Sequence, residues 1–150
     1  MESVGGDKKR KYLFIAVILV FTAFGAFFAY SQSSKEKTGI IEGSLGYPSE
    51  FIPADMRVCA EDISTKQQYC TGDHIQNTKY TYGVGYKFEI PKGKYRVFAT
   101  LPNWVNYRAY YSEYVTCGLG ADCISHSPIV IEVKADNIIN NIDPQDWYNF

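Results

Sequence analysis

Histidine is scarce in this chain of 150 residues, which contains only His74 and His126. A zinc peptidase site needs a His-x-x-Glu pair and a further histidine, and neither histidine here has a glutamate three residues later. The sequence also lacks a nucleophile elbow and a glycine-rich phosphate-binding loop. We therefore predict that the protein is not an enzyme, that it holds no cofactor, and that His126 is a loop residue rather than an acid–base group.

An excess of positive charge is also missing. The chain has 15 Lys and Arg residues against 16 Asp and Glu residues, a net charge of −1. Residues 1–34 hold four basic and two acidic residues, a net of +2, so that −3 remains for residues 35–150. A protein that binds nucleic acid is expected to carry a basic patch, and the sequence shows none. We expect no nucleic-acid partner.

One long apolar run lies near the N-terminus. Residues 12–30 carry no charge, and Lys8, Lys9, Arg10 and Lys11 precede them. A helix of this length, at about 1.5 Å per residue, approaches the thickness of a bilayer core. The basic residues favour a cytoplasmic N-terminus. We predict a cytoplasmic segment at 1–11, a transmembrane signal anchor at 12–30, a linker at 31–38 and an ectodomain at 39–150. The alternative is a cleaved signal peptide, with Ala29 and Ser31 as small residues near the cleavage site.

All four cysteines follow the apolar run, and an even number beyond a membrane segment indicates disulfides in an oxidising space such as the periplasm or the cell exterior. Residues 56–62 and 67–71 form a predicted hairpin. If Asp62 lies opposite Gln67, Cys59 lies opposite Cys70, so we predict a cross-strand disulfide there. A second disulfide would close the small loop from Cys117 to Cys123. The alternative is a structural zinc ion held by four thiolates, for which these spacings are unfavourable.

Period-two alternation predicts β-strands beyond residue 38. The clearest case is the stretch 86–99, which reads as a hairpin with one buried face around Pro91-Lys92-Gly93. Further strands are predicted at 39–45, 107–115, 129–134 and 138–142, and residues 72–85 are predicted to form a loop. No helical periodicity is visible after residue 34. The pattern predicts an all-β protein with a seven-stranded antiparallel β-sandwich behind one N-terminal transmembrane helix.

The order of these segments resembles the carboxypeptidase regulatory-like domain, a prealbumin-like (transthyretin-like) β-sandwich. The resemblance covers about residues 38–143. It is carried by the opening strand, an Asp62–Lys66 hairpin tip, the Pro91-Lys92-Gly93-Lys94-Tyr95 segment, which is similar to the family's Pro-x-Gly-x-Tyr signature, and the Ile131-Glu132-Val133 strand. The two cysteine pairs and the segment 107–123 depart from the pattern. The resemblance implies a non-catalytic module of the kind found beside enzymes or on cell surfaces.

Aromatic residues cluster in one part of the chain and suggest a partner-binding surface. On a strand, the rings at 107 and 111 face opposite to those at 110 and 114, so that one set is core and the other is exposed. Simple core packing is the alternative. The candidate binding residues are Trp104, Tyr107, Tyr110, Tyr111 and Tyr114.

Acidic and amide residues cluster near the C-terminus, and their oxygens suit calcium. The acidic candidates are Asp136, Asp143 and Asp146. The spacing is not that of an EF-hand, and such residues are also common in turns.

Together these features predict a single-pass membrane protein whose β-sandwich acts as a binding or assembly module of the cell envelope, with an envelope protein or glycan as partner. One alternative is a self-assembling structural subunit that associates through exposed strand edges. A further alternative is an accessory domain of a hydrolase.

Overall fold

The computed structural model describes residues 37–104 and 106–149, which form a largely β structure of two sheets with very little helix. Among these residues no helix is long and apolar enough to span a membrane. The predicted cytoplasmic segment and anchor, and most of the predicted linker, lie outside the described residues.

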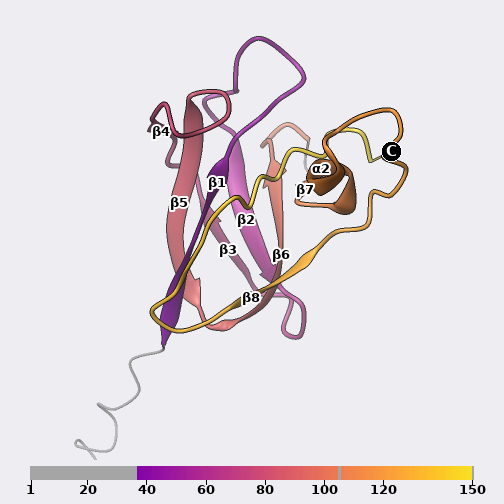
Figure 1. Ribbon diagram of the computed structural model, residues 1–150. Coiled ribbons are helices and arrows are strands. Elements are labelled where there is room, and N and C mark those ends of the chain that lie inside the picture. Colours follow the sequence, from indigo (N-terminus) through magenta and orange to yellow (C-terminus); the bar gives the residue numbers. More distant parts are fainter. Residues whose placement is uncertain (1–36, 105, 150) are drawn as a thin grey trace, which may run out of the picture. The chain divides into compact units, whose positions relative to one another are not determined.

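One sheet has the strand order β4-β5-β1-β9. Its strands are β4 (Ile75–Gln76), β5 (Val84–Pro91), β1 (Thr38–Ser44) and β9 (Ile138–Ile139). Figure 1 shows β1 and β5 side by side. β1 pairs antiparallel with β5 but parallel with β9, where Ile40 lies opposite Ile138. The prediction of a wholly antiparallel sandwich is therefore wrong for this last pair.

The second sheet has the order β3-β2-β6-β7, and β8 also pairs with β6. Its strands are β3 (Gln68–Thr71), β2 (Arg57–Asp62), β6 (Gly93–Thr100), β7 (Ala109–Tyr110) and β8 (Val130–Val133). The described residues thus form nine strands, not seven, because several of them are only two residues long. β4 lies in a segment that the sequence predicts as a loop, since two residues show no alternation.

The sequence predicts that the two arms of the stretch 86–99 pair as a hairpin and share one buried face. The pairing is wrong, but the buried face is confirmed. β5 pairs with β1 and β4, whereas β6 pairs with β2, β7 and β8, so the chain crosses from one sheet to the other at Lys92. The inward side chains of both strands, including Tyr86, Ile90, Tyr95 and Val97, are almost fully buried and meet in the core. Alternation of apolar and polar residues shows which face of a strand is buried. The same alternation occurs whether two consecutive strands pair within one sheet or lie in two sheets that face each other.

The predicted strand at 107–115 is also corrected. Only Ala109 and Tyr110 form β7, and the chain then turns through the short helix α2 (Glu113–Cys117). Gly118 ends this helix with a φ of 112°, a left-handed conformation that glycine adopts freely. The expectation of no helix after residue 34 is wrong here because a helix of five residues is too short to show a 3.6-residue period.

Both predicted disulfides are present. Cys59 lies opposite Cys70 in the β2–β3 pair, and the Asp62 N–H donates to the Gln67 carbonyl at 2.9 Å, which is the register that the sequence predicted. The second bridge joins Cys117 to Cys123 and closes the loop after α2. The four cysteines are therefore not available as zinc ligands.

The C-terminal segment crosses β1 at very close range. An ideal Cβ on Gly43 would stand 1.8 Å from the carbonyl oxygen of Ile142, and that oxygen also accepts a hydrogen bond from the Tyr86 hydroxyl at 2.7 Å. Only a residue without a side chain fits there.

We predict that Gly43→Ala destabilises the protein by about 3 kcal/mol, because the clash is with backbone that cannot rotate away. Gly120→Ala is the matched control, since a Cβ at this position would meet nothing within 4 Å and the φ of Gly120 is not positive. Urea unfolding of both variants measures the difference. Equal midpoints would contradict the close approach.

The tip of the β2–β3 hairpin has a carboxylate at its centre. Asp62 accepts hydrogen bonds from the Ser64 hydroxyl at 2.5 Å and from the N–H groups of Ser64 and Thr65, each at 2.8 Å. The Ser64 hydroxyl is the largest cause that lowers the pKa of Asp62 from 3.8 to about 2. These bonds stabilise the turn only while the carboxylate is ionised.

Because the pKa of Asp62 is lower in the folded state, the folded protein binds fewer protons at acid pH. We predict that the stability provided by the ionised Asp62 carboxylate is fully present above the unfolded pKa of 3.8. This stability is lost as pH falls through the folded pKa of about 2. Asp62→Asn should flatten the curve of unfolding free energy against pH in this window, and Ser64→Ala should flatten it in part. An unchanged slope in Asp62→Asn would refute this role.

Candidate binding surface

The longer loops gather at one end of the sandwich, which we call the loop end, whereas the β2–β3 turn and the turn at 134–137 lie at the other end (Figure 1). There β1 ends beside the start of β5, where Ser44 lies opposite Gly85, and β6 ends beside the start of β2, where Thr100 lies opposite Arg57. The connections at this end are residues 45–56, 77–83 and 101–104, together with the C-terminal segment 143–149. At the opposite end Thr38, the start of β1, lies opposite Pro91 (Figure 1).

Aromatic rings hold the loop end together. The indole N–H of Trp147 donates to the Gly46 carbonyl at 2.7 Å, and its ring meets Tyr47 edge-on with centroids 5.0 Å apart. Tyr107 stacks on the same indole at 5.9 Å, with an interplanar angle of 11°. Trp147 thus joins loops from both sheets, and its buried position is a consequence of tertiary packing.

Four other aromatic side chains at the loop end are exposed to solvent. They are Phe51 at 79%, Tyr82 at 61%, Tyr148 at 50% and Trp104 at 49%. The remaining large exposed apolar side chains of the described residues are aliphatic and lie elsewhere in the chain. Exposed aromatic groups that gather in one place are typical of interaction sites.

The predicted binding residues divide into three kinds. Trp104 is exposed, while Tyr107 and Tyr111 pack against the core. Tyr110 and Tyr114 lie outside the core cluster but their rings are engaged: Tyr110 contacts Phe98 with centroids 5.6 Å apart, and Tyr114 stacks on His126 at 4.5 Å.

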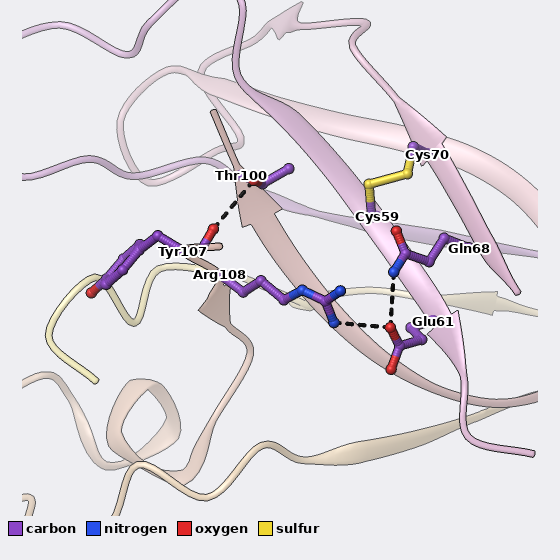
Figure 2. Close-up of a disulfide and its surroundings, with 7 residues drawn as sticks. All are labelled: Cys59, Glu61, Gln68, Cys70, Thr100, Tyr107 and Arg108. Atoms are coloured by element: carbon purple, nitrogen blue, oxygen red, sulfur yellow. Dashed lines mark hydrogen bonds and ion pairs between the residues drawn. A yellow bond between two sulfur atoms is a disulfide. The ribbon is translucent and has the colours of Figure 1, made fainter. Parts of the chain in front are cut away.

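Tyr110 belongs to a polar layer on the outer face of the second sheet. Arg108 lies over the Phe98 ring at 4.4 Å and donates to Glu61 at 2.9 Å and to the Tyr110 hydroxyl at 3.4 Å. Gln68 donates to the same Glu61 oxygen, next to the Cys59–Cys70 disulfide (Figure 2). Tyr110 also lines a hollow of about 540 Å³ with Tyr107 and His126. Because the Tyr110 ring is half-buried and engaged by Phe98 and Arg108, we consider the largely exposed rings of the loop end the better candidate for partner binding.

Sequence reasoning missed Phe51, Tyr82 and Tyr148. A signal was present, because Phe51 lies between Pro48 and Pro53, and Tyr82 precedes Gly83. A large aromatic residue in a turn-rich segment has no strand neighbours to bury it. Such a residue is a better indicator of an exposed ring than one inside an alternating strand.

A hollow of about 360 Å³ lies beside Phe51 and Tyr82. Its apolar lining residues are Tyr47, Phe51, Ile52, Tyr82 and Val84, and its polar lining residues are Ser49, Glu50, His74 and Gln76. A smaller hollow of about 80 Å³ also contacts Tyr47 and Tyr82 and extends to Tyr148. The two hollows therefore adjoin each other across these two tyrosines.

A second hollow of similar volume is lined by Glu42, Lys79 and Tyr80, but its charges are already paired. Lys79 donates to Glu42, and Lys87 lies 3.5 Å from the other carboxylate oxygen. The hydrogen bond from Lys79 is the largest influence on Glu42 and lowers its pKa, against the opposing effect of burial. No unpaired charge among these groups is left to recognise a ligand.

Asp146 is fully buried and is shared by two other side chains. The Ser112 hydroxyl donates to it at 2.6 Å, and His126 Nδ1 donates at 2.9 Å. In a hydrolytic triad the serine instead donates to the histidine, and its hydroxyl must reach the substrate. Here Ser112 is itself fully buried. The three side chains therefore hold the C-terminal segment to the chain around α2 and do not form a nucleophilic site.

The acidic residues predicted to bind calcium have separate contacts. Asp136 is in an exposed turn with a φ of 57°, and Asp143 accepts the Ser44 N–H at 2.6 Å. Burial raises the pKa of Asp143, and the Ser44 hydrogen bond opposes this change. Within residues 37–104 and 106–149, no group of three or more His, Cys, Asp or Glu side chains is placed to hold a metal ion. The described acidic side chains give the calcium prediction no support.

No protein-family model matches the chain, and no curated protein matches it. Among solved structures, the chain is similar to a leucine-rich repeat protein from Bacteroides thetaiotaomicron, with a TM-score of 0.41 and 10% identity. The match covers 73% of this chain and 14% of that protein. Similarity at this level carries no argument about fold or function, so the proposals below depend on the residues themselves.

We predict that Asp146→Ala destabilises the protein by about 3 kcal/mol, because it leaves the buried Ser112 hydroxyl and the His126 N–H without an acceptor. Asp122→Ala, at an exposed position, is the control and should change stability by less than about 0.5 kcal/mol. Thermal unfolding at neutral pH compares the two variants. Similar losses in both would show that the Asp146 contacts contribute little.

Proposed function

We propose that the protein is a membrane-anchored, non-catalytic binding module of the cell envelope. In this proposal residues 12–30 span the cytoplasmic membrane with the N-terminus in the cytoplasm. The β-sandwich lies in the periplasm or outside the cell, where its two disulfides are stable. The loop end binds an envelope protein or glycan.

The observation that carries the proposal is the placement of the four exposed aromatic side chains. All of them lie at the loop end, away from Thr38, where the chain from the proposed anchor enters β1. Exposed apolar area is unfavourable in water by about 25 cal/mol per Å², and covering it with a partner recovers that free energy. A domain tethered at one end is best placed to meet partners with the other.

The resemblance to the carboxypeptidase regulatory-like domain supports the proposal at the level of architecture only. A two-sheet β structure in which most strand pairs are antiparallel is compatible with a prealbumin-like sandwich. The parallel β1–β9 pair and helix α2 depart from the simplest form of that fold. The absence of a catalytic role is proposed because Ser112 and Asp146, both fully buried, and the partly exposed His126 are used to hold the C-terminal segment.

A self-assembling subunit is the second candidate, and one observation favours it. β3 pairs only with β2 among the described strands, so its other edge offers unpaired backbone groups to another copy. The same experiment can test both candidates.

We predict that a photo-crosslinking residue introduced at Tyr82 or Trp104 of the full chain captures a partner in intact cells, whereas one at Glu132 does not. Glu132 is an exposed residue of β8, near the opposite end and opposite Lys94. The crosslinks should saturate as the partner becomes limiting. Equal yields at all three sites would refute a role for the loop end. Crosslinks solely between copies of the chain would favour the self-assembling subunit.

A further inference from the structure

We infer that the groove formed by the two adjoining hollows at the loop end binds a neutral saccharide chain. We call it the Phe51–Tyr82 groove. The inference rests on the proposed binding function and names the chemical class of the ligand and the residues that recognise it.

The aromatic side of the groove suits a sugar ring. Phe51 and Tyr82 leave 79% and 61% of their surface exposed, and both line the larger hollow. A pyranose ring has a face of C–H groups with partial positive charge, and the face of an aromatic ring carries partial negative charge. Stacking of the two covers apolar surface on both partners without requiring a deep cavity.

The polar side of the groove offers hydrogen-bonding groups of both kinds. His74 Nε2 lies 2.9 Å from the Met56 carbonyl, which can only accept, so Nε2 carries the proton. Nδ1 of the neutral ring is then an acceptor. The Glu50 carboxylate also accepts, and the Gln76 amide both donates and accepts. Sugar hydroxyls donate and accept, so they can satisfy all three side chains.

Other ligands fit these groups less well. The described residues that line the larger hollow include no Lys or Arg, and Glu50 would repel an anionic ligand. A purely apolar ligand would cover Gln76, Glu50 and the second ring nitrogen of His74 without offering them hydrogen bonds, which is costly. A neutral saccharide combines the apolar face and the hydroxyls that this lining requires.

The arrangement of the hollows favours a chain over a single sugar. Tyr47 and Tyr82 contact both hollows, and Tyr148, which is half exposed, lies along the smaller one. Three exposed rings, Phe51, Tyr82 and Tyr148, thus border two adjoining spaces. Successive units of a linear saccharide can contact successive rings.

The test uses the full chain in a detergent without a sugar headgroup, titrated by calorimetry with four neutral hexasaccharides. The probes are the hexamers of N-acetylglucosamine, β-1,4-glucose, β-1,3-glucose and xylose. We expect at least one to bind. Phe51→Ala and Tyr82→Ala should each weaken binding at least about tenfold, and Phe51→Tyr should preserve it. Ile124→Ala, at an exposed side chain that lines neither hollow, should change affinity by less than about twofold.

The melting temperature of each variant shows whether its fold is intact; both rings are exposed, so we expect little change. The inference is overturned if none of the four hexasaccharides binds the wild-type chain, or if binding survives in the Phe51→Ala/Tyr82→Ala double variant. In either case, a partner still captured by crosslinking at Trp104 would leave the proposed function standing, with a ligand of another class. If no hexasaccharide binds and no partner is captured by crosslinking, both the saccharide inference and the proposed binding function are refuted.

Discussion

The structure depends on the contact between β1 and the C-terminal segment, two parts of the chain that are about 100 residues apart. At Gly43 the two backbones approach more closely than any side chain would allow, and the Tyr86 hydroxyl from the neighbouring strand donates to the Ile142 carbonyl. This contact closes one side of the sandwich and directs the chain onward to the loop end. Trp147 can then reach the Gly46 carbonyl and stack on Tyr107, joining loops from both sheets.

At the loop end, some polar and aromatic side chains are buried and others are exposed. Asp146 and Trp147 are buried and satisfied, one by Ser112 and His126 and the other by the Gly46 carbonyl. Their directional bonds hold the loops in one arrangement. The side chains of Phe51 and Tyr82, in contrast, remain largely exposed to solvent. Exposed aromatic rings on loops that are already fixed in place suit a binding surface, because binding a ligand then costs little conformational entropy.

Sequence reasoning succeeded where a local pattern has only one structural meaning. The β2–β3 hairpin was predicted with its register and its disulfide, since a short turn after Asp62 determines which residues face each other. The same reasoning failed at Lys92, because alternation on both sides of a turn describes a hairpin and a crossing between sheets equally well. It also failed at α2 and β4, which are too short to show any period.

The sequence by itself determined the β character of the domain, its inward side chains and its cysteine pairs, because each follows from neighbours along the chain. The tertiary structure alone decided which strands share a sheet, that the rings of Tyr110 and Tyr114 contact Phe98 and His126, and that Phe51 and Tyr82 stand beside Glu50, His74 and Gln76. These residues of the hollow come from the 45–56 loop, from β4 and the residue before it, and from the 77–83 loop, and the tertiary fold brings them together. A surface assembled from distant segments leaves no periodic trace in the sequence.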